Sequence, residues 1–365
     1  MPALKKIVVQ NFRNIAFQEL SFSPNINCIS GNNGEGKTNL IDAIYYLSMT
    51  KSALAATDKF NFRHGTDSFT VAGTYQMSNG LESKFSVQVR SDGEKKVKRD
   101  EKTYQRASEH IGALPIVLVS PADISMVSTS GEERRKFVNS VLSQMDRSYL
   151  SDVQQYNRYL LQRNHLLKSS APDEDLLCAF DARLSSLAIP VAESRRRFVE
   201  ALTPVVQDFY RELSGGKEEV SIEYVTDMDK GPLSEQLLKH RDVDKALKFT
   251  RLGVHRDDFI FNMDGYPIRK CGSQGQQKSF LVSLKFAQYE LMKESYGFPP
   301  ILLLDDLFDK LDMGRVSNLL SMVAGSDFGQ IFLTDSNKVR LESIVDALTD
   351  DRSYFETSGG EFKLL

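Results

Sequence analysis

The stretch that decides the fold is Gly31-Asn32-Asn33-Gly34-Glu35-Gly36-Lys37-Thr38. It has the spacing G-x-x-x-x-G-K-[ST], in which glycines let backbone N–H groups converge on phosphate oxygens. A lysine at this position reaches the β and γ phosphates of a nucleoside triphosphate, and the hydroxyl that follows is a ligand for Mg²⁺. The pattern therefore predicts that residues 31–38 bind ATP, with Thr38 on the metal ion.

The neighbouring sequence supports a phosphate-binding loop rather than an ordinary glycine turn. Residues 26–30 form a short strand-like run that stops at Gly31, and from Thr38 the spacing becomes helical. The apolar residues of that helix share one face: Leu40, Ile41, Ile44 and Leu47. A helix that starts directly after the loop adds a favourable dipole for bound phosphate.

A second motif supplies two carboxylates. Residues 301–304 are an apolar run, predicted as a buried strand, that ends in Asp305 and Asp306. Beside a phosphate-binding loop, Asp305 is expected to hold Mg²⁺ opposite Thr38, and Asp306 to position or deprotonate the attacking water. The alternative is an acidic turn after a core strand, which the loop at 31–38 makes the weaker interpretation.

A third motif opens the predicted helix that starts near residue 274. It reads Gly272-Ser273-Gln274-Gly275-Gln276-Gln277, and in isolation it is typical of a glycine turn with a helix cap. In combination with the other motifs, its S-x-G-Q core resembles the signature of ABC-type ATPases, and Asp312 matches the D-loop of that class. The resemblance implies an ATP-sandwiched homodimer with signature residues of one subunit at the nucleotide of the other, namely Ser273, Gly275, Gln276 and Asp312.

With these motifs, the whole chain resembles the RecF family of bacterial recombinational repair. The matching stretches, in family order, are Asn11-Phe12-Arg13-Asn14, Asn33-Gly34, Gly36-Lys37-Thr38-Asn39, Gln162-Arg163-Asn164, His255-Arg256-Asp257-Asp258, Gly272-Ser273-Gln274-Gly275-Gln276-Gln277 and Leu304-Asp305-Asp306. The resemblance implies an SMC-like ATPase head, with Asn39 in the nucleotide site and Arg13 as a phosphate contact.

The same resemblance implies a function. ATP binding would close a homodimer on double-stranded DNA or on single/double-strand junctions, and slow hydrolysis would release it. Such a protein works with RecO and RecR to help load RecA at single-strand gaps, in recombinational repair and replication-fork recovery. Any activity is expected to be a weak, DNA-stimulated ATPase that serves as a switch.

Several positions depart from the patterns of related ATPases. Asp306 stands where ABC-type ATPases carry glutamate, and its shorter side chain predicts slow hydrolysis. Asp335 occupies the place of the switch histidine of transporters. The glutamine of the Q-loop has no counterpart near Ser120, where Asp123 is the nearest polar candidate.

The composition, and the distribution of strand and helix patterns along the sequence, indicate the domain organisation of the chain. The 365 residues are 41% hydrophobic, with 46 Lys and Arg against 49 Asp and Glu, as in a globular protein of about two domains. After about residue 130, some eighty residues lack strand patterns and show helical spacing instead, and we expect the helical stretch to be interrupted at Pro190 and Pro204. We therefore expect an α/β protein: an ABC-type P-loop ATPase head with an antiparallel β subdomain at 1–128 and 218–365, and an inserted α-helical arm at 129–217.

The chain is expected to be cytoplasmic and to need no membrane. Its three cysteines are far apart and lack metal-ligand spacing, and no apolar run approaches the ~20 residues that cross a bilayer. The net charge of -3 means that contacts with DNA must come from local patches. The candidate patches are Lys95 to Lys102, Arg134 to Lys136 and Arg195 to Arg197, although a solvated face is the favoured interpretation of any one of them.

Three other functions remain possible at this point. A transporter ATPase subunit would need a membrane partner, and the long interval from Gly36 to Ser273 speaks against it. The head of a chromosome-structuring or nuclease-associated ATPase would flank a long coiled coil, but the helical insertion lacks sustained heptads. A small-molecule phosphotransferase would leave the signature motif unexplained.

Overall fold

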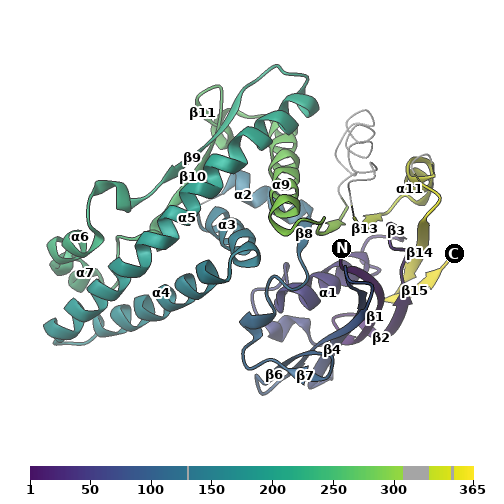
Figure 1. Cartoon of the computed structure of the whole chain (residues 1–365), viewed down its shortest axis with the longest axis horizontal. Helices are drawn as coiled ribbons and strands as arrows, with labels where there is room; N and C mark the ends of the chain where they lie inside the picture. Colours follow the sequence, from purple (N-terminus) through teal and green to yellow (C-terminus); the bar gives the residue numbers. More distant parts are fainter. Residues whose placement is uncertain (130, 307–328, 347–348) are drawn as a thin grey trace. The chain divides into compact units, whose positions relative to one another are not determined.

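The computed structural model describes residues 1–129, 131–306, 329–346 and 349–365 (Figure 1). Its contacts divide it into two compact units, Met1–Ile124 with Leu284–Leu365, and Ser125–Ser283. The boundaries fall inside helix α2 (Ile124–Ser128) and inside helix α9 (Gln274–Tyr296). This division assigns residues 218–283 to the unit that contains the helical insertion, whereas the sequence prediction joined them to the ATPase domain.

The first unit contains a six-stranded sheet in the order β15-β14-β3-β13-β12-β8. All neighbouring strands are parallel except the pair β14 and β15. Its central strands are apolar and buried on both faces, as in parallel sheets covered on both sides, which confirms the predicted α/β class. The strands are β3 (Ile26–Ser30), β8 (Ile116–Val119), β12 (Ile301–Leu304), β13 (Ile331–Asp335), β14 (Arg352–Ser358) and β15 (Glu361–Leu364).

A second sheet of this unit is an antiparallel meander in the order β2-β1-β4-β5-β6-β7. Its strands alternate between buried and more exposed residues, and Gly80 and Gly93 adopt positive φ in the turns between β4, β5 and β6, where glycine carries no steric penalty. The strands are β1 (Ala3–Phe12), β2 (Ile15–Ser21), β4 (Ser68–Gln76), β5 (Glu82–Arg90), β6 (Lys95–Arg99) and β7 (Lys102–Thr103).

Helix α1 (Lys37–Met49) packs between these two sheets and contributes to one hydrophobic core with both of them. The sequence predicts a single apolar face, but Ala43, Tyr46 and Met49 are buried as well, because a helix between two sheets is covered on opposite sides. Within the described residues, the unit also contains the part of α9 from Leu284 onward and the short elements η1 (Asp58–Asn61), η2 (Ala107–His110), η3 (Pro121–Asp123) and α11 (Lys338–Val345).

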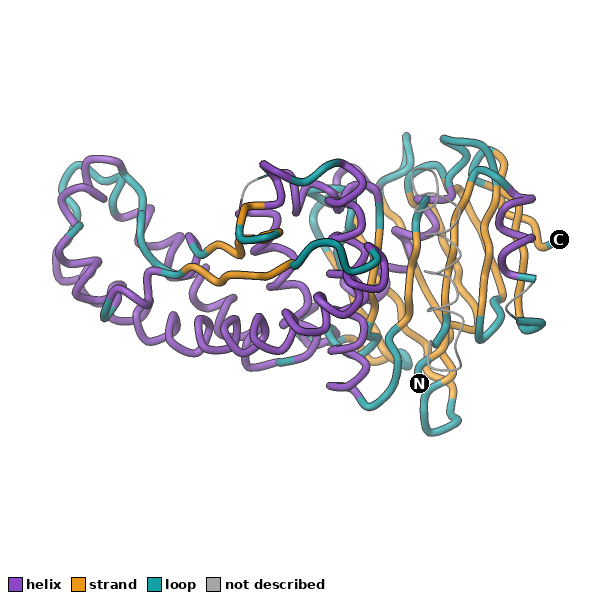
Figure 2. The backbone as a smooth tube through the Cα atoms, turned by 90° about the horizontal axis from the view of Figure 1, so that it is seen from above, coloured by secondary structure: helices purple, strands orange, loops and turns teal. Residues whose placement is uncertain are grey.

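The second unit is built around α3 (Gly131–Met145), α4 (Arg147–Leu166) and α5 (Glu174–Ser214), and α4 and α5 lie side by side (Figure 2). Helix α5 continues for 41 residues through Pro190 and Pro204, so the predicted interruptions are wrong. A proline removes one backbone hydrogen bond, but buried residues at helical spacing along α5 hold the turns on either side against the neighbouring elements.

An antiparallel sheet in the order β11-β10-β9 belongs to the same unit. It is joined to α5 by Gln207, whose Nε2 donates to Val220 O at 2.8 Å, and to α3 by the ion pair of Arg134 with Asp258. These contacts explain why residues 218–283 cluster with the helices. The elements are β9 (Val220–Val225), η4 (Asp227–Lys230), α6 (Leu233–Lys239), α7 (Arg241–Leu247), η5 (Val254–Arg256), β10 (Asp258–Met263), β11 (Tyr266–Pro267) and α8 (Ile268–Cys271).

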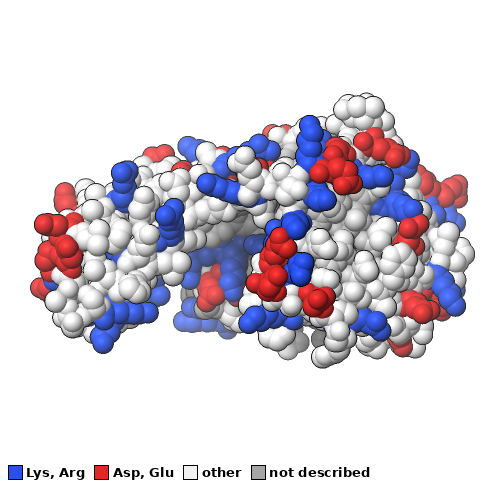
Figure 3. Space-filling model, turned by 90° about the horizontal axis from the view of Figure 1, so that it is seen from below, with Lys and Arg blue, Asp and Glu red and all other residues white. Residues whose placement is uncertain are grey.

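The surface carries both signs of charge. Figure 3 shows Lys and Arg side chains intermixed with Asp and Glu over one face, in keeping with the net charge of -3. None of the helices in the described ranges is long and apolar enough to span a bilayer. Asp312 lies outside the described residues.

Candidate nucleotide-binding site

The loop predicted to bind phosphate connects the carboxyl end of β3 to the first residue of α1. Gly34 and Gly36 adopt φ values of 87° and 113°, which favour glycine. A Cβ atom on Gly36 would lie only 2.8 Å from Nδ2 of Asn14, and one on Gly31 only 2.7 Å from the carbonyl of Thr357. The glycines are therefore required both by the backbone conformation and by close neighbours.

Lys37 extends along this loop. Its Nζ donates to the carbonyl oxygens of Gly31 at 2.9 Å and Asn32 at 3.3 Å, and it lies 3.9 Å from Oδ1 of Asp306. Its side chain is only 3% exposed. A buried ammonium held by carbonyl oxygens suits a ligand whose oxygens carry negative charge, because charge-assisted bonds are stronger than those to neutral carbonyls.

Asp305 meets the loop because β3 and β12 are parallel and flank β13, so that their carboxyl ends share one edge of the sheet. Its Oδ1 accepts hydrogen bonds from the hydroxyls of Thr38 at 3.0 Å and Thr334 at 2.7 Å. Burial raises the pKa of Asp305 to about 6, against the effect of these two bonds. The hydroxyl of Thr38 and this carboxylate are adjacent hard oxygen ligands, a donor set that fits Mg²⁺.

Asp306 follows at a turn with φ of 42°, in the left-handed region. Its backbone N–H donates to the hydroxyl of Thr334 at 2.9 Å, so one threonine holds both members of the carboxylate pair. Sequence reasoning did not single out Thr334 for this role. Its position on the strand between β3 and β12 becomes informative only once the strand order is known.

Arg13 lies behind the loop, in a buried polar cluster. Its guanidinium forms an ion pair of 2.8 Å with Asp42, which is 1% exposed, and donates to Asn39 at 3.2 Å. Asn39 in turn donates to Asn14 at 2.7 Å. Burial raises the pKa of Asp42, and the charge of Arg13 opposes this rise. The structure thus brings Arg13 and Asn39 together beside the loop, with Arg13 engaged by protein groups.

The carboxyl-terminal hairpin of the chain braces the loop through Glu35. The carbonyl oxygen of Glu35 accepts from Gly360 N at 2.9 Å and from the hydroxyl of Thr357 at 3.1 Å, and its carboxylate accepts from Gly359 N. Nothing in the sequence indicates this contact, because its partners are separated by more than three hundred residues.

Two of the positions that depart from the patterns of related ATPases, Asp335 and Asp123, have partners within the chain. Asp335 is 1% exposed and accepts two hydrogen bonds from Arg340, at 2.6 and 2.7 Å. Asp123 caps its own turn by accepting from Ser120 N at 2.8 Å, and forms an ion pair of 3.3 Å with Lys285. Each of these two carboxylates is therefore engaged by a basic side chain of the protein.

The signature residues lie in the second unit, at the start of α9. Ser273 N donates to Oε1 of Gln276 at 2.7 Å, and Gln276 N donates to Oγ of Ser273 at 3.3 Å, which is a reciprocal helix cap. Ser273 and Gly275 are exposed. The simple capping interpretation is therefore correct for the local structure, and it leaves this exposed surface available to a partner.

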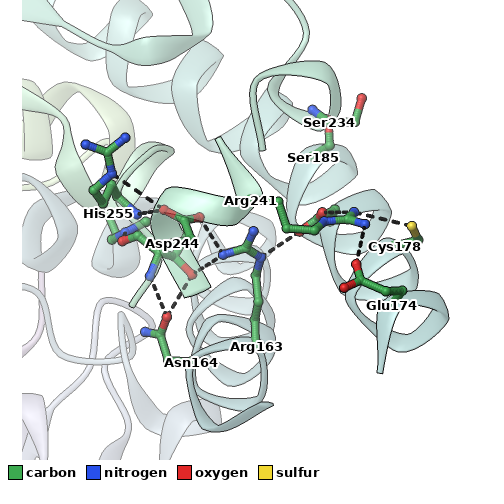
Figure 4. A network of polar contacts seen from close by, with 12 residues as sticks. Arg163, Asn164, Glu174, Cys178, Ser185, Ser234, Arg241, Asp244 and His255 are labelled. Atoms are coloured by element: carbon green, nitrogen blue, oxygen red, sulfur yellow. Dashed lines mark hydrogen bonds and ion pairs between the residues drawn. The ribbon is translucent and has the colours of Figure 1, made fainter. Parts of the chain in front are cut away.

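The Gln162-Arg163-Asn164 motif belongs to the second unit, and Arg163 and Asn164 hold its helices together (Figure 4). Arg163 is fully buried and forms ion pairs with Asp181 at 2.6 Å and Asp244 at 2.8 Å, which joins α4 to α5 and α7. Asn164 accepts from Thr250 N at 2.7 Å. Its oxygen thereby fixes the chain after α7.

The comparisons with known proteins agree with this geometry. The RecF/RecN/SMC N terminal domain model matches residues 3–350. A DNA replication and repair protein RecF of Parabacteroides distasonis is 41% identical over 358 residues, which is 98% of each chain. This chain belongs to the RecF family. A second RecF protein, from Bacteroides thetaiotaomicron, is 40% identical over 98% of this chain and 97% of its own.

Solved structures give the same result. A recombination mediator protein RecF of the RecFOR pathway, solved with ATP, has a TM-score of 0.90 and 30% identity, covering 100% of this chain and 98% of that one. An Smc head domain from Pyrococcus furiosus, with a TM-score of 0.60 and 16% identity over 100% of this chain and 96% of that one, shares the fold. The predicted ABC-type, SMC-like ATPase head is therefore confirmed, and the protein is a RecF-family member of DNA replication and repair.

Proposed function

We propose that this protein is an ATP-dependent DNA-binding protein whose homodimer closes when ATP binds and opens after slow hydrolysis. The observation that carries the proposal is the meeting of the glycine loop with the carboxylate pair at one sheet edge. Thr38 donates to Asp305 at 3.0 Å, and the ammonium of Lys37 lies 3.9 Å from Asp306. The RecF-family relationship over nearly the whole chain supports the same conclusion.

ATP with Mg²⁺ is the proposed cofactor pair. The amides of residues 31–38 and the ammonium of Lys37 would bind the phosphates, and Thr38 and Asp305 would hold the metal ion. Bound Mg²⁺ would neutralise the charge that develops on the phosphate oxygens. The solved RecF–ATP structure, with a TM-score of 0.90, supports ATP as the ligand.

Asp306 is the proposed group that orients the attacking water and accepts its proton. Its backbone is fixed by Thr334, while its side chain remains 23% exposed, so water has access to it. An aspartate reaches less far than the glutamate that other ABC-type ATPases use here, which supports slow turnover. Slow turnover in turn suits a switch, since the bound state then persists.

Homodimerisation is proposed through the exposed start of α9. Ser273, Gly275 and Gln276 of one subunit would face the nucleotide on the partner, together with Asp312, which lies outside the described residues. The local helix cap gives this surface a fixed backbone. The helix start would also direct backbone N–H groups toward a negatively charged ligand.

The proposed setting is cytoplasmic recombinational repair and replication-fork recovery, with double-stranded DNA and single/double-strand junctions as substrates. RecR is the proposed direct partner, and RecO and RecA act in the same pathway. The solved relative of the RecFOR pathway supports this assignment. The transporter interpretation finds no support in relatives that match 98% of the chain as replication and repair proteins.

The test is nucleotide binding and hydrolysis by the purified chain. Loss of the Lys37 ammonium removes charge-assisted bonds worth roughly 1.5–3 kcal/mol, so Lys37→Ala should bind ATP about 10- to 100-fold more weakly. Asp306→Asn should bind ATP and fail to hydrolyse it. Lys363→Ala removes an exposed lysine of β15 in the same unit and should behave as wild type. Unchanged ATP affinity in Lys37→Ala would contradict the assignment.

A further inference from the structure

A cavity of about 350 Å³ lies within the second unit, between α3, α4, α5 and η5. Its volume is within the roughly 300–1,000 Å³ of small-ligand pockets. Polar side chains dominate the wall, and they include Glu132, Arg135, Lys136, Asn139, Tyr156 and Arg195. The nucleotide site belongs to the other unit, so this cavity is a separate feature.

The amide of Asn139 is oriented by a chain of hydrogen bonds. Arg195 Nε donates to the Tyr149 hydroxyl at 3.0 Å, so the hydroxyl hydrogen is directed to Asn139 Oδ1 at 2.6 Å. Arg195 also donates to the same Oδ1 at 3.0 Å. Two donors identify the accepting atom as the amide oxygen Oδ1, so the remaining atom of the amide is the nitrogen Nδ2. This nitrogen has no hydrogen-bond acceptor among the described residues. Asn139 therefore offers an N–H donor to the cavity.

Arg135 supplies the charge. Its NH1 donates to the backbone oxygen of Asp257 at 2.6 Å, and within the described ranges no carboxylate oxygen lies within 4.0 Å of its guanidinium. The other cations of the wall are already neutralised: Lys136 pairs with Glu132 at 2.9 Å, and Arg195 with Asp257 at 2.6 Å. Arg135 is thus a half-buried cation without an ion pair.

The surroundings of Arg135 favour an anion. Burial lowers the pKa of Arg135, and although the charges of Asp258 and Glu132 oppose this, the charges of Arg195 and Arg256 lower it further. Asp258 is itself held by a bidentate contact with Arg134, at 2.8 and 3.0 Å. An anion in the cavity would relieve the repulsion among these arginines, since opposite charges stabilise a partly buried cation.

We propose that this arm cavity binds a phosphate group, with the guanidinium of Arg135 and the amide of Asn139 as its donors. A guanidinium recognises phosphate through paired N–H donors, and Asn139 adds a donor whose direction is already fixed. The phosphate belongs either to the backbone of DNA, in which case the inference rests on the proposed DNA binding, or to a free phosphate compound.

The test uses two variants and a matched control in the full chain. Arg135→Gln removes the charge. Asn139→Asp keeps an oxygen for Tyr149 and Arg195 but replaces the donor by a negatively charged acceptor. Arg197→Gln removes one positive charge from an exposed position on α5, outside the cavity. Melting temperatures in chloride buffer show that each variant folds, and Arg135→Lys, which keeps the charge, serves as a second variant at the same site.

The first assay addresses free phosphate. Inorganic phosphate is added to the Lys37→Ala protein, in which the nucleotide site is weakened, at constant ionic strength. Binding to the folded state raises the melting temperature by mass action. We expect this rise to disappear when Arg135→Gln or Asn139→Asp is added, and to persist with Arg197→Gln.

The second assay addresses DNA. Fluorescence anisotropy of a labelled duplex is measured across salt concentrations, and loss of one phosphate contact should flatten the slope of log K against log salt by about 0.9. A flatter slope in Arg135→Gln, but not in Arg197→Gln, assigns the phosphate to DNA, whereas a change confined to the melting assay assigns it to a free phosphate compound. Variants that match the control in both assays overturn the inference. If the wild type does not bind DNA, the proposed function is contradicted. The melting assay then still tests whether the cavity binds phosphate.

Discussion

Acid should weaken the second unit through His255, and the size of the effect follows from its contacts. Nε2–H of His255 donates to Thr250 O at 3.0 Å, and Nδ1 lies 2.9 Å from the Tyr156 hydroxyl, from which the neutral ring accepts a hydrogen bond. Burial, aided by the charges of Arg256 and Arg135, lowers the pKa of His255 to about 4. The unfolded chain has a value near 6.5.

The sign follows from linkage. Because the folded pKa is the lower one, protons bind more tightly to the unfolded chain, so this contribution to stability is complete above about pH 6.5 and is lost as the pH falls toward 4. Near pH 5 most unfolded chains carry the proton at this ring and few folded ones do. With 1.36 kcal/mol per pKa unit, the loss between about pH 7.5 and pH 5 is about 2 kcal/mol.

The assay is urea unfolding at these two pH values, with His255→Gln as the reference. Glutamine is neutral at both and offers an acceptor for Tyr156 and a donor for Thr250. Other groups titrate in both proteins, so the difference between them isolates the ring. Wild type should lose about 2 kcal/mol more than the variant. Equal losses in the two proteins would refute the reasoning.

Three further changes are expected to have distinct effects. Arg163→Met removes a fully buried cation from Asp181 and Asp244, which keep only Arg241 at 2.7 Å and Arg251 at 3.6 Å among the described residues, and should cost roughly 3–5 kcal/mol in urea unfolding; a cost below about 1 kcal/mol would contradict the network. Arg13→Gln should lower the melting temperature, and adding Asp42→Asn should recover part of it, whereas additive losses would argue against a coupled pair. Gly36→Ala places a Cβ 2.8 Å from Asn14 at a φ of 113°, so ATP binding should be lost while the circular dichroism of the helices is retained; normal ATP affinity would show that the loop can adapt.

The sequence predicted the parts of the site that depend on local spacing. The glycine loop, the helix after it and the apolar strand before Asp305 are each formed by consecutive residues, so their sequence patterns can be recognised without knowledge of the fold. The antiparallel meander is predictable for the same reason, because Gly80 and Gly93 mark its turns. The RecF-family resemblance added the order of these motifs along the chain.

Contacts between distant residues could not be predicted in this way. Arg134 and Arg195 lie in basic triplets that look like solvated or DNA-binding surface, yet each is buried against an aspartate, and Asp258 is 124 residues from Arg134. The support of Glu35 by the carboxyl-terminal hairpin is likewise a product of strand order. In α5, packing along the helix outweighs the local effect of Pro190 and Pro204.

The most direct test of the ATP-closed dimer is sedimentation velocity of three proteins with and without Mg-ATP. Wild type should sediment as a monomer without nucleotide and as a dimer with it. Lys37→Ala and Ser273→Arg should remain monomeric, the first because ATP binds weakly and the second because an exposed signature position is blocked. A wild type that stays monomeric at saturating Mg-ATP, or a Ser273→Arg protein that dimerises as well as wild type, would contradict the account.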